Sequence, residues 1–467
     1  MKTFALVLLA SLCLGLLAAA FVSTRGKVAR FNHIVIVVQE NRTPDNLFGS
    51  NPRFEPGVDI ASFGQTSTGA TIPLRPAPLA DCWDVLHSHK SFEQAYNGGR
   101  MNGFNLEGTT MPSTCILPGG PPQYKYVDNS TGTVQPYFDI AKGYGWANRM
   151  FQTNEGPSFP AHQFILGGTS APTPDSAYFA AELPSGGGGC LASADSFVTL
   201  ISPLGREDSS TYPCLEHGTL TDLLDDAGLT WKYYSPTTSW NAPLAIGHIC
   251  QPDVVNGVLK CTGSDYISDD IHKPPRVLTD IHNCQLANVV WVIPSQAYSD
   301  HAGVNNGTGP AWVASIVNAI GTQPTCANRE TYWDDTAILI TWDDWGGWYD
   351  HVPPPKVIKD GTSWGSGYVY GFRVPLLVVS AFTNAGQVSD SVHDFGSLLR
   401  FVEVNFRLRL IGNGTYADAH ASNLTEFFPR KTPRRFAAIQ TSIGGPLKAE
   451  QFRTEKMVEP DNDGDEE

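Results

Sequence analysis

The chain has 467 residues, of which 41% are hydrophobic and 11% aromatic, and this composition supports a large folded core and excludes a disordered chain. Its 46 acidic residues outnumber its 31 basic ones and give a formal net charge of −15, which argues against a nucleic acid as partner, since phosphate binding needs clustered Lys and Arg. This length also fits a single elaborated α/β domain.

Residues 1–22 have the pattern of an export signal. Met1 and Lys2 provide a short positive start, an almost wholly apolar run continues from Phe4 to Val22, and three alanines at 18–20 offer a cleavage region. An uncleaved membrane anchor is the alternative, because about 20 apolar residues can span a bilayer. We expect cleavage, and a location in the periplasm, outside the cell or at the cell surface.

The cysteines agree with export. Apart from Cys13 in the apolar segment there are eight, an even number without any CxxC spacing, so disulfides are a better interpretation than structural zinc. Their pairing stays open. At the other end, residues 441–467 are predicted to form a solvated acidic tail, which leaves residues 30–440 as one folded domain.

The first predicted strand is the apolar run Phe31–Gln39, which reads as a strand buried on both faces. It ends at Glu40 and Asn41, whose side chains offer hard oxygen ligands. The alternative for these two residues is a helix N-cap, a common use of Asn.

Two histidines follow a loop-like region at 62–80 that is rich in Thr, Gly and Pro. His87 and His89 are two residues apart, so on an extended stretch both side chains would point the same way and could contact a phosphate or a metal. The alternative is a pair of ordinary loop histidines.

Strands and helices alternate along the rest of the chain, and this predicts an α/β fold with a mostly parallel sheet sandwiched by helices and with loop-rich insertions. The expected helices are Pro136–Phe151, Thr219–Ala227, Trp312–Ile320 and Gly396–Phe406, and the expected strands are Leu229–Tyr234, Ala287–Pro294 and Val374–Phe382.

The most informative stretch is AILITWDDWGGWYDHVPPP, at 337–355. A buried strand, Ala337–Trp342, stops at Asp343 and Asp344, and Asp350 and His351 follow within a few residues. Ligands of open parallel sheets sit beyond the carboxyl ends of the strands, so these side chains predict a metal or phosphate site. An isolated Asp-Asp pair would more often cap a helix or lie in a solvated loop.

Two of these stretches resemble motifs of the bacterial phosphoesterase family, which contains haemolytic and non-haemolytic phospholipases C and a class of acid phosphatases. QENRTPDNLFG at 39–49 is similar to the family's ENR-S-F-D-x-x-x-G opening, with Thr43 and Pro44 in place of Ser-Phe. TWDDWGGWYDHVPPP at 341–355 is similar to T-x-D-E-x-G-G-x-Y-D-H-V-P-P-P, with Asp344 where Glu is usual. The resemblance extends from about residue 32 to about residue 428.

Other positions match this family less completely. Ser158 falls in the G-P-[ST]-x-P turn where the family places its nucleophile, but Ala161 and His162 replace the usual Asn-Arg, which puts phosphate contacts by those side chains in doubt. His301 falls in the family's S-x-H-P segment, with Ala302 in place of the proline. Without the resemblance Ser158 would be an unremarkable serine, and His301 would read as a loop histidine.

The resemblance implies an alkaline-phosphatase-like architecture for residues 30–440 and an exported, metal-dependent phosphoric ester hydrolase of the phospholipase C type. One divalent metal ion of unspecified identity would be held by Glu40, Asn41, Asp343, Asp344 and Ser158, and the Ser158 hydroxyl would attack phosphorus. The histidines expected to contact the phosphoryl oxygens or act as general acid are His87, His89, His301 and His351. Asp350 would orient one of them.

Two other functions remain open at this point. One is an acid phosphatase acting on phosphomonoesters, and the other is a secreted binding protein that kept the fold without turnover. Trp345 and Trp348 would suit a phospholipid if exposed, but they are equally plausible in a core. Sulfate ester cleavage is a weaker interpretation, since no Cys/Ser-x-Pro-x-Arg stretch is present. The oligomeric state is open.

Overall fold

The computed structural model describes residues 30–441 except 118, 186–187, 237–239, 323–325, 327–330, 356–357, 360–361 and 364–369, and gives only the backbone of 358–359 and 362–363. The predicted signal, 1–22, and all but the first residue of the predicted tail, 441–467, lie outside the described residues. Within the described part, none of the helices has the length and apolar character needed to cross a bilayer.

The centre of the fold is an eight-stranded sheet, in which five of the seven neighbouring pairs are parallel. The two antiparallel pairs both involve β20, which runs opposite to its neighbours β17 and β8. The prediction of a mostly parallel sheet is therefore confirmed. In spatial order the strands are β15 (Asp270–Ile271), β12 (Trp231–Tyr234), β16 (Val289–Val292), β1 (His33–Gln39), β17 (Thr336–Trp342), β20 (Leu376–Ser380), β8 (Gly145–Ala147) and β21 (Gln387–Ser389).

The two central strands, β1 and β17, are buried along their whole length. Their continuous apolar sequences suit this position, because a strand covered on both faces has no solvent side to carry polar residues. They pair in parallel with Gln39 opposite Trp342, and the Asp343 N–H donates to the Gln39 carbonyl at 2.9 Å. The residues that follow the two strands are therefore neighbours at one edge of the sheet.

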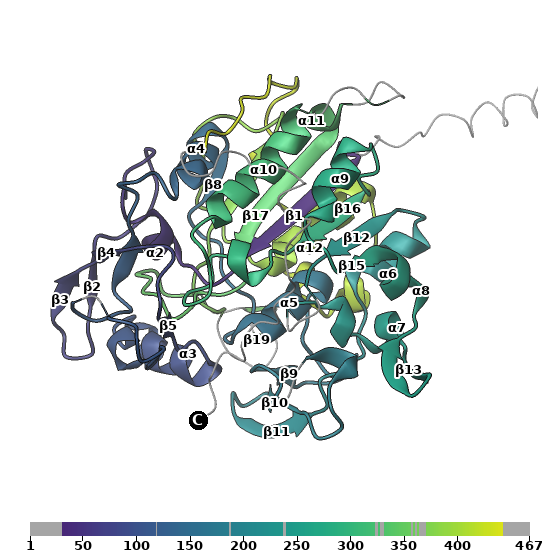
Figure 1. Ribbon diagram of the computed structural model, residues 1–467, viewed down its shortest axis with the longest axis horizontal. Helices are drawn as coiled ribbons and strands as arrows, with labels where there is room; N and C mark the ends of the chain where they lie inside the picture. The colour runs from purple at the N-terminus through teal and green to yellow at the C-terminus, as the bar shows by residue number, and fades with distance from the viewer. Residues whose placement is uncertain are drawn as a thin grey trace, which may run out of the picture.

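Helices cover both faces of the sheet, as predicted. Figure 1 shows α9 and α10 in front of the sheet and α12 behind it. The hydrophobic core is continuous from the sheet into both helical layers. The helices are α2 (Pro44–Phe48), α3 (His89–Tyr96), α4 (Gln135–Gly143), α5 (Ser158–Gly167), α6 (Leu220–Asp226), α7 (Gly247–Cys250), α8 (Ser264–Asp269), α9 (Arg276–His282), α10 (Gly309–Thr322), α11 (Tyr332–Asp335) and α12 (Phe395–Phe406).

The predicted helix at 136–151 is too long, since α4 ends at Gly143 and the chain then enters strand β8. At Gly145 a side chain would collide with the Phe427 ring, 2.6 Å from the position of its Cβ, so glycine lets β8 pack against this ring. The helical periodicity of the preceding residues gives no sign of this change, because the pairing of β8 with β20 and β21 is long-range.

The insertions around the main sheet carry small sheets of their own, and these include strands in the region 62–80 that we expected to be loop. Their strands are β2 (Phe63–Gln65), β3 (Thr71–Pro73), β4 (Arg75–Ala77), β5 (Asp84–Val85), β6 (Thr109–Thr110), β7 (Lys125–Val127), β9 (Phe179–Ala180), β10 (Val198–Ile201), β11 (Glu207–Thr211), β13 (Pro252–Val255), β14 (Val258–Cys261), β18 (Ile358–Lys359) and β19 (Thr362–Ser363). Of these strands, β2, β3, β11 and β13 lie at the periphery of the molecule in Figure 1.

All eight cysteines outside the apolar N-terminal segment form disulfides, which confirms the predicted use of these residues. Each bond closes a loop of no more than 42 residues in sequence separation, so each constrains a local segment of the chain. The pairs are Cys82–Cys115, Cys190–Cys214, Cys250–Cys261 and Cys284–Cys326.

Candidate active site

The candidate site begins where β1 and β17 end. Glu40, Asn41, Asp343 and Asp344 follow the two strands, and all four side chains are fully buried. One oxygen of Asp343, Oδ1, accepts the backbone N–H of Asn41 at 3.0 Å and that of Asp344 at 2.7 Å, and so fastens the two strand ends together.

Gly346 permits this close approach. It has a φ of +61°, and a Cβ built on it would lie 2.5 Å from the Asn41 carbonyl oxygen. The glycine therefore lets the Asn41 segment come near.

Ser158 lies between the two pairs of residues. It is the first residue of α5, and its Oγ is 3.4 Å from Glu40 Oε2 and 3.2 Å from Asp344 Oδ2. The preceding turn needs Gly156, since a Cβ there would meet the Ala181 carbonyl oxygen at 2.0 Å. The structure thus brings the hydroxyl at 158 to carboxylates more than a hundred residues away on either side in the sequence.

A further side chain, His162, joins this group and was not among the predicted site residues. It lies four residues after Ser158 on α5, hence on the same side of the helix. Its Nε2 is 3.4 Å from Glu40 Oε1 and 3.8 Å from Asp343 Oδ2. The spacing of four residues from Ser158 could have indicated that the two side chains lie on the same side of a helix. That inference requires knowing that a helix begins at residue 158.

The electrostatics of this group are unusual for a buried cluster. Burial, and then the charge of Asp343, raise the pKa of Asp344 well above its ordinary value. Burial lowers the pKa of His162 to about 4, against the opposing effect of Asp343. The buried atoms Asn41 Oδ1 and Asp343 Oδ2 have no hydrogen-bond partner among the described residues. A buried oxygen without a hydrogen-bond partner lowers the stability of the fold, and a bound cation would supply the missing partner.

His87 and His301 border the carboxylates. A positive charge on either histidine lowers the pKa of Asp344. The centres of the two imidazole rings lie 6.0 Å apart. His87 Nδ1 lies 2.7 Å from the Val85 carbonyl and its Nε2 is 2.9 Å from the Asn41 amide nitrogen. His301 Nδ1 lies 2.7 Å from the Ala302 carbonyl. With Asp84, these histidines also form a second group whose ligand atoms are close enough to share a cation.

His89 has different partners. The stretch expected to be extended is the start of α3, with Ser88 as its N-cap, so His87 and His89 do not share a set of contacts. The His89 ring bonds to Glu155 and Glu207 on its two nitrogens. Burial acts to lower the pKa of His89, but the two carboxylates outweigh it and raise the pKa to about 10. This geometry makes His89 a buried cation rather than a neighbour of Ser158.

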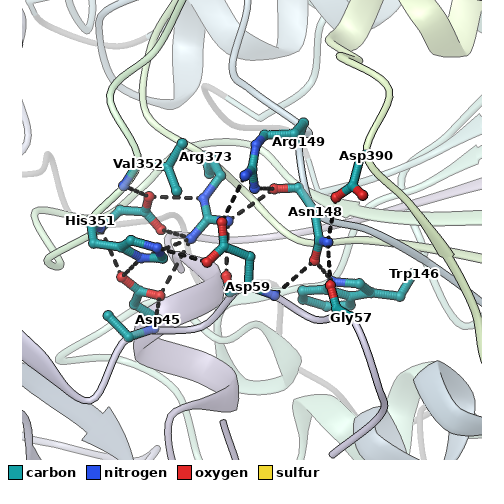
Figure 2. A network of polar contacts seen from close by, with 12 residues as sticks. Asp45, Gly57, Asp59, Trp146, Asn148, Arg149, His351, Val352, Arg373 and Asp390 are labelled. Atoms are coloured by element: carbon teal, nitrogen blue, oxygen red, sulfur yellow. Dashed lines mark hydrogen bonds and ion pairs between the residues drawn. The ribbon is translucent and has the colours of Figure 1, made fainter. Parts of the chain in front are cut away.

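Asp350 and His351 belong to a separate ionic network, shown around Arg373 in Figure 2. The Asp350 carboxylate accepts two hydrogen bonds from Arg373, both at 2.9 Å, so it orients a guanidinium where we had expected it to orient a histidine. His351 bonds to Asp45 at 2.8 Å and to Asp59 at 3.0 Å. Within the described part of the chain, none of these hydrogen bonds joins the network to Ser158.

The two tryptophans considered for lipid contact are core residues. Trp345 and Trp348 have no exposed surface. Trp345 packs edge-on against Phe92 and Phe372, and the Arg42 guanidinium lies over the Trp348 ring at 4.9 Å. They therefore provide no surface for a lipid.

Comparison with known proteins gives a family match over most of the chain. The model of the family described as "Phosphoesterase family" matches residues 31–409. Non-hemolytic phospholipase C of Pseudomonas aeruginosa is 25% identical, with 93% of this chain and 63% of that protein covered. The corresponding protein of Burkholderia pseudomallei is 24% identical over 82% of this chain and 56% of its own length. The chain thus spans less than two thirds of these two relatives.

Two further proteins are similar. Phospholipase C A of Mycobacterium tuberculosis is 24% identical, with 87% of this chain and 79% of that protein covered. Among solved structures, a protein in the alkaline phosphatase superfamily from Vibrio parahaemolyticus aligns with a TM-score of 0.36 and 10% identity, over 85% of this chain and 71% of that one.

Proposed function

The chain belongs to the phosphoesterase family, as its motifs predicted, and on this premise we propose that it hydrolyses phosphoric esters with Ser158 as the nucleophile at a divalent-cation site. The observation that carries the proposal is the position of the Ser158 hydroxyl, within 3.4 Å of one carboxylate oxygen from the end of β1 and 3.2 Å of another from the end of β17.

The residues at the two strand ends suit a divalent cation. Asn41, Asp343 and the neighbouring carboxylates offer hard oxygen donors, and two of these oxygens are buried without a hydrogen-bond partner in the described chain. A bound cation would ease deprotonation of the Ser158 hydroxyl and offset the repulsion between the carboxylates and a phosphate.

The remaining steps follow from the protein's own groups. The Ser158 hydroxyl gives its proton to one of the carboxylates that it faces, Glu40 or Asp344. Its oxygen forms a bond to phosphorus while the bond from phosphorus to the leaving alcohol breaks, and His87 or His301 supplies the proton that the leaving oxygen takes. Water then attacks the phosphoserine and releases the phosphate product with Ser158 restored. Because Ser158 opens α5, the positive end of that helix faces the developing charge.

We propose that the substrate is a phospholipid, cleaved as by a phospholipase C. Similarity to proteins named phospholipase C supports this choice. A second support is the presence of three exposed apolar side chains in one segment, Leu106, Met111 and Ile116, which are 56%, 48% and 86% exposed. Their segment pairs through β6 with β5, the strand that leads to His87. Export fits such a substrate, and the four disulfides support it.

The test compares hydrolysis of phosphatidylcholine and of p-nitrophenyl phosphate by the cation-loaded protein and by Ser158→Ala. We expect the wild type to prefer phosphatidylcholine and Ser158→Ala to lose on the order of 10⁴-fold or more in rate while its metal content persists. Ser315→Ala is the matched control, because Ser315 is also buried but lies on α10 and donates to the Ala311 carbonyl.

Three results would change the proposal. Preference for p-nitrophenyl phosphate would make the protein a phosphatase of the acid phosphatase type. Full activity in Ser158→Ala would remove the serine from the mechanism. Absence of turnover of both substrates by the metal-loaded wild type would leave a binding protein on the same fold.

A further inference from the structure

A chain of hydrogen bonds fixes the orientation of the His162 ring. The Tyr233 hydroxyl donates to the backbone carbonyl of Trp240 at 3.2 Å. The hydroxyl has only this one proton to donate. In its 3.3 Å contact with His162 Nδ1, the imidazole N–H is therefore the donor and the hydroxyl oxygen the acceptor. All three side chains are at most 2% exposed, and water does not compete for these bonds.

This arrangement places the proton of a neutral His162 on Nδ1 and leaves a lone pair on Nε2. That lone pair faces two oxygens, Glu40 Oε1 at 3.4 Å and Asp343 Oδ2 at 3.8 Å. Neither Nε2 nor Asp343 Oδ2 has a hydrogen-bond partner in the described chain. Three electron-rich atoms that converge in a buried space repel one another unless something positive lies between them.

The distances match a shared metal ion better than direct hydrogen bonds. Nitrogen-to-oxygen hydrogen bonds are about 2.7–3.2 Å long, shorter than either separation here. Two ligands of a tetrahedral zinc ion, each about 2.0–2.1 Å from the metal, lie about 3.4 Å apart. Glu40, His162 and Asp343 also have ligand atoms that all lie within 4.8 Å of one another.

We propose that His162 Nε2 is a nitrogen ligand of the cation at this site and that it makes the site prefer Zn²⁺ or a similar borderline metal over Mg²⁺ and Ca²⁺. Imidazole suits zinc and its neighbours, whereas magnesium and calcium favour all-oxygen sites. Tyr233 acts as a positioning residue, because its hydroxyl sets which ring nitrogen carries the proton. The inference rests on the cation site of the proposed function and specifies its chemistry.

The test uses the full-length protein stripped of metal and titrated separately with Zn²⁺ and with Mg²⁺ by calorimetry. In His162→Gln, an amide oxygen replaces the nitrogen, so we expect zinc affinity to fall by at least about tenfold and magnesium affinity to change much less. Tyr233→Phe should weaken zinc binding in the same direction. His33→Gln is the control, since His33 is a buried histidine at the opposite end of β1 that bonds to the Ala287 carbonyl.

A spectroscopic readout makes the result independent of affinity. The Mn²⁺-loaded wild type should show nitrogen hyperfine coupling from a directly bound imidazole by pulsed electron paramagnetic resonance, and His162→Gln should lose it. Retention of the coupling, or an unchanged ratio of zinc to magnesium affinity in His162→Gln, would overturn the inference and leave the proposed function standing. Failure of the wild type to bind any of these cations would overturn both.

Discussion

Asn41 follows β1 and adopts a left-handed backbone conformation, with a φ of 62°. Asparagine tolerates this region better than most residues, so the chain can turn sharply after β1. The turn directs the Asn41 N–H to Asp343 and its amide group to His87. A single residue in this way connects the carboxylates to one of the two histidines that border them.

His351 shows how the ionic network depends on one titratable side chain. Burial acts to lower the pKa of His351, but its hydrogen bond to Asp45 and the charges of Asp45 and Asp350 outweigh this effect and raise the pKa to about 9. The imidazolium is therefore the stable form at neutral pH, and it joins Asp45 of α2 to Asp59 of the following loop.

The stability of the protein should consequently depend on pH through this residue. The folded-state pKa of about 9 lies above the ordinary value of 6.5, so the contribution of His351 is complete below pH 6.5 and is lost as the pH rises through 9. We expect the difference in melting temperature between the wild type and His351→Gln to be largest near pH 6 and to shrink toward pH 9.5. A difference that stays constant over this range would show that the charge of His351 contributes nothing.

At the scale of elements, α5 contributes most to the site. Its first turn carries Ser158, its second carries His162, and all of its residues are buried. A helix buried on every side has no amphipathic pattern, which is why the sequence gives little sign of it. Its position is decided by packing against α12 and by the Gly156 turn that precedes it.

The segment 104–117 is the element that we expect to meet lipid. A disulfide joins its Cys115 to Cys82, and β6 pairs with β5. Three of its apolar side chains, Leu106, Met111 and Ile116, are exposed to solvent. An apolar side chain that enters a lipid surface contributes about 1.5–3 kcal/mol. Replacement of Ile116 by Asp should therefore lower the rate on phosphatidylcholine vesicles about tenfold or more and leave the rate on a soluble short-chain ester unchanged.

Ile267→Asp provides the matched control for that experiment. Ile267 is 68% exposed and lies on α8, on the other side of the molecule from β5 in Figure 1. An equal loss in both variants would indicate a general effect of the added charge, and a loss on the soluble ester would indicate damage to the site itself.

At the scale of the whole molecule, the site exists only after folding, because residues near 40, 158 and 343 converge on it. A cation that binds this folded arrangement should stabilise it, and by linkage a free cation concentration 100-fold above its Kd adds about 2.7 kcal/mol to the free energy of unfolding. We expect chelation to lower the melting temperature of the wild type and to have little effect on Asp343→Asn. An equal effect on both proteins would place the stabilising cation elsewhere.

The sequence by itself predicted the parts of the fold that depend on local pattern. The largely apolar runs before Glu40 and Asp343 identified the two central strands, because a strand covered on both faces needs no solvent-facing polar residues. Parallel pairing then placed polar residues at one edge of the sheet, and the motifs pointed to Ser158. The even number of cysteines predicted disulfides but not which residues pair.

Tertiary structure decided which side chains meet. His87 and His89 are only two residues apart, yet one lies by Asn41 and the other between Glu155 and Glu207. His162 interrupts a family pattern, yet it faces Glu40. The physical reason is that a partner is chosen by packing between segments far apart in the chain, and local periodicity carries no information about such contacts.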